Sequence, residues 1–189
     1  MKTTSFCVPI VILLKLTMKL GLNMIPQRIQ RIRKKGFNLQ KHSKKLNGLD
    51  CVYVGRGTRW GNPFRLVKYS DGKWSIKTDG SDRCNELLIK HCHAVYDTRD
   101  AAAIDAIKCY NFWLLPYTHK DGSMMEFYQA MVQIDDAIIS LKGKNLSCWC
   151  KIIDENDNYC LCHADLLLSL ANNKSIDEVR KENIKTIIR

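Results

Sequence analysis

The chain has 189 residues, of which 46% are hydrophobic and 26% are charged. This length and composition fit one globular domain with its own core, and they exclude a largely disordered protein. The mean hydropathy of −0.25 argues against an integral membrane protein.

The charge is concentrated at one end. Residues 1–49 contain 11 lysines and arginines and no acidic residue, whereas basic and acidic residues balance in the remainder, so this segment accounts for the net charge of +11. A basic segment ahead of a neutral body is typical of phosphate contact, in nucleic acid or an acidic surface. A solvated lead-in is the alternative.

Residues 1–23 partly resemble a signal peptide. The run Phe6–Leu14 is apolar and follows Lys2, but Lys15 and Lys19 end it too early to span a bilayer. No clear small-residue cleavage site follows. We expect a dispensable, non-conforming extension ahead of Met24, with a signal or anchor and a packed helix as alternatives.

Residues 24–48 are predicted to form a basic arm or a short helix, because Ile25, Ile29 and Ile32 recur at helical spacing. A strand is expected over 50–55. The pair Asp71-Gly72 lies between two β-rich runs, which indicates a hairpin.

Three helical stretches follow, marked by apolar residues within 87–95, 104–114 and 127–141. A short strand is predicted over 145–150 and a core helix around Leu166–Leu170. Ser175 with Glu178 forms a capping-box pattern that opens a C-terminal helix within 174–189. These elements predict an α/β or α+β domain over 49–173, with a small sheet of three to four strands and four to five helices.

The nine cysteines cannot all pair within one chain, and several lie in apolar helical stretches. This pattern favours a reducing, cytoplasmic location over a secreted disulfide scaffold. Only the cysteines near the C-terminus form a tight cluster. Its members, with the adjacent histidine, are Cys148, Cys150, Cys160, Cys162 and His163.

Three interpretations of this cluster remain open. Four of its side chains could bind zinc tetrahedrally, although the spacing is not the usual one and Cys162 and His163 are adjacent. Cys162, at a predicted helix start, could instead be a reactive or catalytic thiolate beside His163. The third interpretation is core packing between strand and helix.

A second candidate site follows the strand over 50–55, where ligand loops of α/β folds often lie. The segment 56–64 supplies Arg56 and Arg59 for a phosphate, Trp60 for stacking on a base, and Asn62. It has neither of the glycine-rich phosphate-loop patterns. The alternative is a rigid turn in which Trp60 and Phe64 fill the core.

Three blocks of sequence resemble a family catalogued as domain of unknown function 4326. The similarity runs from about residue 25 to 172. The blocks are Pro26–Arg31 with Lys35-Gly36, Val52–Arg56 running into Trp60–Phe64, and Leu141–Cys150 followed by Cys162–Leu167. The loop 151–159 is longer and more acidic than the family pattern, and Cys160 is additional to it. The shared set of candidate metal ligands is therefore Cys148, Cys150, Cys162 and His163.

The resemblance implies a small α/β-type domain of phage and bacterial genomes, located in the host cytoplasm if phage-encoded, and it supplies no catalytic residues. Two function classes follow. One is an accessory protein that binds a nucleotide or nucleic acid through Arg56, Arg59 and Trp60. The other is a small enzyme on a nucleotide-like substrate, with Cys162 or His163 as the reacting group. A zinc-stabilised structural module is the third alternative, and no membrane partner is expected.

Overall fold

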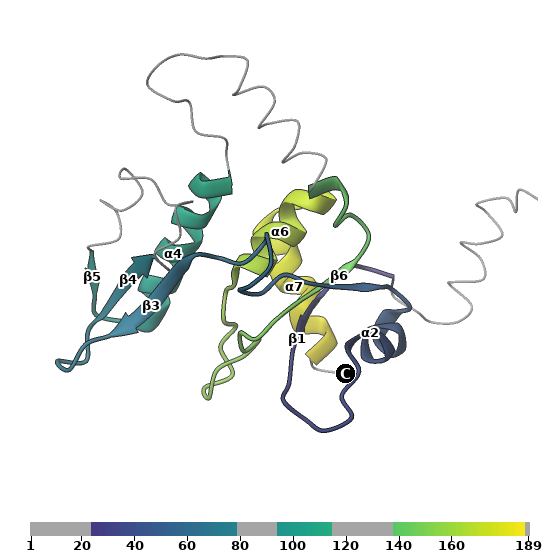
Figure 1. Ribbon diagram of the computed structural model, residues 1–189, viewed down its shortest axis with the longest axis horizontal. Coiled ribbons are helices and arrows are strands. Elements are labelled where there is room, and N and C mark those ends of the chain that lie inside the picture. The colour runs from purple at the N-terminus through teal and green to yellow at the C-terminus, as the bar shows by residue number, and fades with distance from the viewer. Residues whose placement is uncertain (1–23, 79–93, 115–137, 188–189) are drawn as a thin grey trace, which may run out of the picture.

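The computed structural model describes residues 24–78, 94–114 and 138–187 (Figure 1). The expected N-terminal extension, most of the helical stretch 87–95 and most of the stretch 127–141 lie outside these residues. Within the described ranges, no helix is long and apolar enough to cross a membrane.

The first sheet is parallel and has the strand order β1-β6-β2. Its strands are β1 (Arg28–Gln30), β2 (Cys51–Tyr53) and β6 (Asn145–Cys148). The central strand β6 is buried at every position. Because the strands are parallel, their carboxyl ends meet at one edge, where the chain continues into Arg31, Val54 and Trp149.

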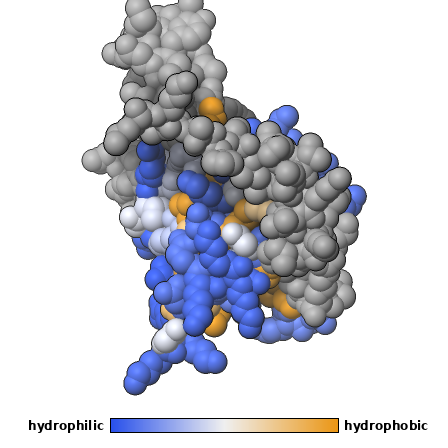
Figure 2. Space-filling view, turned by 90° about the vertical axis from the view of Figure 1, so that its right-hand side faces the viewer, coloured by the Kyte–Doolittle hydropathy of each residue, from blue (hydrophilic) through white to orange (hydrophobic). Residues whose placement is uncertain are grey.

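A buried amide network fixes the opposite edge of this sheet. The side-chain oxygen of Asn145 accepts hydrogen bonds from the backbone of Gln27 at 2.8 Å and from Asn47 at 3.0 Å. Its nitrogen donates to Ser43 at 2.8 Å. Ser43 and Asn47 lie on α2 (Leu39–Asn47), so one buried asparagine joins β6, β1 and this helix. The face that carries α2 is hydrophilic over most of its described surface (Figure 2).

The second sheet is antiparallel and contains β3 (Phe64–Lys68), β4 (Trp74–Thr78) and β5 (Val95–Tyr96). The predicted hairpin is confirmed, because β3 pairs with β4 and Gly72 turns the chain with a φ of 86°. Helix α4 (Arg99–Leu114) packs against β3 and β4, which confirms the predicted second helix. Val95, expected at the end of a helix, belongs to β5 instead.

Of the two C-terminal helices, the first packs against β6 and β1 of the parallel sheet, and the second packs against the first (Figure 1). They are α6 (His163–Asn172) and α7 (Ile176–Ile187), and the predicted capping box between Ser175 and Glu178 opens α7. Apolar residues of α6 join Tyr110 and Leu114 of α4 and Leu146 of β6 in one buried cluster. The two sheets therefore share a core.

The fold is α+β, with two three-stranded sheets and four helices among the described residues. The predicted fold class is confirmed. The sequence pattern did not separate the hairpin from the strands of 50–55 and 145–150. The alternation of apolar and polar residues indicates that a segment is a strand, but which strand it pairs with depends on contacts between segments far apart in the sequence.

Candidate functional site

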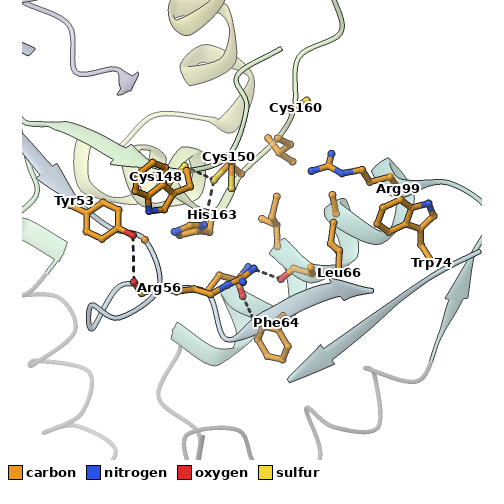
Figure 3. Close-up of a pocket in the computed structure, with 18 residues that line it drawn as sticks. Tyr53, Arg56, Phe64, Leu66, Trp74, Arg99, Cys148, Cys150, Cys160 and His163 are labelled. Atoms are coloured by element: carbon orange, nitrogen blue, oxygen red, sulfur yellow. Dashed lines mark hydrogen bonds between the residues drawn. The ribbon is translucent and has the colours of Figure 1, made fainter. Parts of the chain in front are cut away.

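A pocket of about 540 Å³ lies between the carboxyl edge of the parallel sheet and the second sheet with α4. Figure 3 shows Cys148, Cys150 and His163 gathered on one side, with Arg99 and Trp74 on the opposite side. Arg56 and Asn62 also line the pocket. Arg56 and Asn62, from the candidate ligand loop 56–64, therefore line the same pocket as the predicted cysteine cluster.

Three thiols form the most closely spaced group in this wall. The sulfur atoms of Cys148, Cys150 and Cys162 all lie within 4.8 Å of one another. Cys148 ends β6, Cys150 lies beyond the strand and is exposed, and Cys162 is the N-cap of α6. The Cys148 and Cys162 sulfurs are 3.2 Å apart. The loop 151–161 therefore folds back and unites the two halves of the cluster.

His163 lies beside this group with a defined orientation. Its Nε2 lies 2.8 Å from the backbone oxygen of Val54, and its Nδ1 lies 3.3 Å from the Cys162 sulfur. A carbonyl can only accept, so Nε2 carries the proton and Nδ1 presents its lone pair to Cys162. Burial lowers the pKa of His163, which favours this neutral form.

The three thiols do not ionise alike. Burial alone raises the pKa of Cys162, but hydrogen bonds from Cys148 and Cys150 and the charge of Arg28 outweigh it, so this pKa is well below its usual value. Hydrogen bonding to Cys150 and Cys162, together with burial, raises the pKa of Cys148. The hydrogen bond to Cys148 alone would lower the pKa of Cys150, but the hydrogen bond to Cys162 and burial outweigh it, so this pKa is also raised. Cys162 is therefore the thiol of this group that loses its proton most readily, and the His163 Nδ1 lone pair is the acceptor that its S–H faces.

A buried ion pair positions the start of α6. The Arg28 guanidinium lies 2.9 Å from the Asp165 carboxylate, and neither side chain is exposed. The same carboxylate accepts the backbone N–H of Cys162 at 2.8 Å, and Arg28 also donates to the Cys160 carbonyl at 2.8 Å. This network holds the Cys162 backbone between β1 and α6.

The predicted ligand loop divides between pocket and core. Arg56 and Asn62 line the pocket, whereas the Trp60 side chain is buried in the core and Arg59 stacks on it at 5.0 Å. The Trp60 carbonyl accepts a 2.6 Å hydrogen bond from Tyr110. Asn62 accepts the backbone N–H of Phe64 at 2.8 Å, so it also shapes the turn. Cys160 lines the pocket but lies outside the group of three thiols.

Sequence reasoning missed two residues of the opposite wall, Arg99 and Trp74. Arg99 begins α4 and Trp74 begins β4, and neither belongs to a local motif. Only the packing of the second sheet against the first brings them to the cysteines. Among the described residues, the pocket lining contains two arginines and no carboxylate.

Comparison with known proteins gives a family and no function. No curated protein and no solved structure shows significant similarity to the chain. Residues 37–173 match the family described as Domain of unknown function (DUF4326), and this span includes Arg56 and the whole thiol cluster. The chain therefore belongs to the DUF4326 family.

Proposed function

We propose that this domain holds a zinc ion between Cys148, Cys150 and Cys162, and that the pocket beside the metal binds a nucleotide-like anion. The observation that carries this proposal is the placement of three sulfurs within 4.8 Å of one another in the wall of a pocket. Zinc sites with three protein ligands leave a fourth position for water or a ligand, and such sites border pockets.

The chemistry of the donor set supports zinc. Thiolates are soft ligands that select zinc over magnesium or calcium. Tetrahedral Zn–S bonds place the sulfurs roughly 3.8 Å apart, and the Cys148 and Cys162 sulfurs are 3.2 Å apart. These two side chains would therefore separate slightly around a bound ion. His163 is not one of the three proposed ligands. Its Nδ1 lies 3.3 Å from the Cys162 sulfur and its Nε2 donates to the Val54 carbonyl, so it positions Cys162 beside the ion.

The rest of the pocket supports an anion with a flat group. Arg56 and Arg99 provide positive charge, and none of the described lining residues carries a carboxylate. Outside the lining, Arg99 lies 3.8 Å from the exposed carboxylate of Asp100, which offsets only part of this charge. Arginine binds phosphate through paired N–H donors. Tyr53 and Trp74 add aromatic surface to the lining, and the volume of about 540 Å³ is that of a small-molecule site. A nucleotide combines these two chemistries.

Cobalt substitution tests the metal site. The full chain, stripped of metal and titrated with Co²⁺, should develop the thiolate charge-transfer and tetrahedral d–d absorption bands. Cys150→Ser should weaken these bands, since Cys150 is exposed and its loss leaves the core intact. Cys160→Ser is the matched control, because Cys160 lines the same pocket outside the thiol group. Unchanged spectra in Cys150→Ser would reject the proposed ligand set.

Calorimetric titration tests the anion site separately. Nucleoside monophosphates should bind the full chain, and the corresponding uncharged nucleosides should bind at least about tenfold more weakly. Arg56→Gln should reduce monophosphate affinity, whereas Arg65→Gln, on an exposed position of β3, should not. Equal affinity for nucleosides and monophosphates would reject the anion site.

A second candidate function is thiol catalysis by Cys162. It is favoured by the 3.3 Å separation of the His163 Nδ1 from the Cys162 sulfur, with the imidazole tautomer fixed by Val54. A protein that binds no zinc but whose Cys162 reacts with iodoacetamide faster than Cys160 would support this function. His163→Gln would then slow the alkylation of Cys162 specifically.

A further inference from the structure

Two arginines and two aromatic rings form a stacked cluster beside the pocket. The Arg31 guanidinium lies 4.8 Å from the centre of the Tyr53 ring and 5.0 Å from the centre of the Trp149 ring. The Arg33 guanidinium lies 5.2 Å from the centre of the Trp149 ring. Trp149 is 42% exposed although it lies between two cysteines of the thiol group. We call these four residues the arginine–aromatic cluster.

The cluster lies where the three parallel strands end. Arg31 follows β1, Tyr53 ends β2, and Trp149 follows β6. Tyr53 and Trp149 also line the pocket, so the cluster continues the pocket wall onto the surface. A ligand that fills the pocket and extends outward in this direction meets Arg31 and Arg33.

Stacking leaves these arginines able to bind phosphate. A guanidinium on an aromatic ring has one face covered, while its N–H groups point outward in the plane and stay available for paired hydrogen bonds. Neither arginine forms a salt bridge with any residue in the described ranges. Exposed Lys34 and Lys35 follow directly, and residues 24–49 contain no acidic side chain.

We infer that the arginine–aromatic cluster binds the phosphate backbone of a single-stranded nucleic acid whose terminal nucleotide occupies the pocket. This inference rests on the proposed anion pocket and names its substrate class. A series of phosphates matches arginines both inside and outside the pocket. Arginines that lie over exposed aromatic rings are typical of surfaces that bind single-stranded nucleic acid. A base must be unpaired to enter a pocket of this size.

Fluorescence anisotropy with a labelled, short oligodeoxythymidine tests the inference, alongside titration of thymidine monophosphate into the same protein. The oligonucleotide should bind more tightly than the monophosphate, and its affinity should fall steeply with salt. The double variant Arg31→Gln, Arg33→Gln should lose about tenfold or more in oligonucleotide affinity. Monophosphate affinity should stay within about twofold. Trp149→Ala should also weaken oligonucleotide binding, and because Trp149 lines the pocket its monophosphate affinity should fall as well.

The control is Arg65→Gln with Arg180→Gln, which removes two exposed arginines elsewhere on the described surface. Circular dichroism should show that every variant is folded. An oligonucleotide that binds no tighter than the monophosphate, or equally well to the double variant, overturns the inference and leaves the pocket proposal intact. Equal affinity for a blunt duplex also overturns it. If the unaltered chain does not bind the monophosphate at all, both the anion pocket and the nucleic-acid inference are rejected.

Discussion

The Arg28 guanidinium and the Asp165 carboxylate lie 2.9 Å apart with no exposed side-chain surface on either residue. This pair joins the first strand of the parallel sheet to the helix that begins after Cys162. Asp165 also accepts hydrogen bonds from Tyr159 at 2.7 Å and from the Cys162 backbone at 2.8 Å. Burial raises the pKa of Asp165, and the charge of Arg28 opposes that shift. The geometry of the thiol cluster therefore depends on a pair outside the pocket lining.

Removing one partner of the Arg28–Asp165 pair should strongly lower the stability of the folded protein. We expect Asp165→Asn to lower the free energy of unfolding by about 3–5 kcal/mol, because it leaves Arg28 buried without a counter-charge. Urea unfolding followed by circular dichroism measures this. Lys151→Ala is the control, since it breaks an exposed ion pair with Glu155 and should cost less than about 1 kcal/mol. A loss below about 1 kcal/mol for Asp165→Asn would show that the pair is dispensable.

The capping box at the start of α7 should make a smaller and independent contribution to the stability of the fold. Ser175 Oγ accepts the Glu178 backbone N–H at 3.2 Å, and Glu178 accepts the Ser175 backbone N–H at 2.7 Å. Ser175→Ala should therefore lower the free energy of unfolding by about 1 kcal/mol. Lys181→Ala, exposed on the same helix, is the control and should change little. An unchanged unfolding midpoint in Ser175→Ala would contradict this role of the cap.

The same cap predicts a pH dependence. Hydrogen bonds from Ser175 lower the pKa of Glu178 in the folded protein. The stabilisation is therefore present above the pKa of Glu178 in the unfolded chain, and it is lost as the pH falls through the lower, folded-state pKa. The difference in unfolding midpoint between the unaltered chain and Glu178→Gln should shrink on acidification. A difference that grows as the pH falls would contradict the cap geometry.

Gly61 should control the position of Arg56. A Cβ atom at Gly61 would lie 2.7 Å from the Arg56 Cα and 3.0 Å from the Gly55 oxygen, which are backbone atoms that cannot rotate away. Gly61→Ala should displace the Arg56 backbone and weaken monophosphate binding as much as Arg56→Gln does. Calorimetric titration of both variants measures this effect. Undiminished affinity in Gly61→Ala would mean that Arg56 does not hold the ligand.

The short distance between Cys148 and Cys162 predicts sensitivity to oxidation. Diamide, which takes up two electrons and two protons, should join these thiols in a disulfide in metal-free protein, since their sulfurs are 3.2 Å apart. Bound zinc should protect both thiols. Peptide mapping by mass spectrometry would identify the bond, with Cys160→Ser as a control that still forms it. A disulfide formed equally fast in zinc-loaded protein would argue against these two ligands.

Several parts of the fold could be predicted because their signals are local. The turn at Asp71-Gly72, the apolar periodicity of 104–114 and the cap at Ser175 each need only neighbouring residues. The two-sheet arrangement could not, because β1 pairs with β6 across more than a hundred residues. The short strand predicted over 145–150 accounts only partly for the cluster, since β6 ends at Cys148 and Cys150 joins the group from the following loop.

The candidate site shows the same division. Motif spacing drew attention to Arg56, Cys148, Cys150 and Cys162, which the fold places in one pocket wall or beside it. Trp60 is a residue type that often stacks on bases, yet its ring is buried in the core. Arg99 carries no local signal and enters the lining through the packing of α4. Position in the tertiary structure, rather than residue type, decides which side chains line the pocket.

Zinc content measured by elemental analysis tests the central claim most directly, with the full chain purified from medium without added metal. The unaltered chain and Cys160→Ser should each carry about one zinc per chain. Cys150→Ser should carry markedly less, and a chelator should lower the melting temperature of the unaltered chain but not that of Cys150→Ser. Less than about a tenth of a zinc per chain in the unaltered protein, with a melting curve that a chelator leaves in place, would contradict the account.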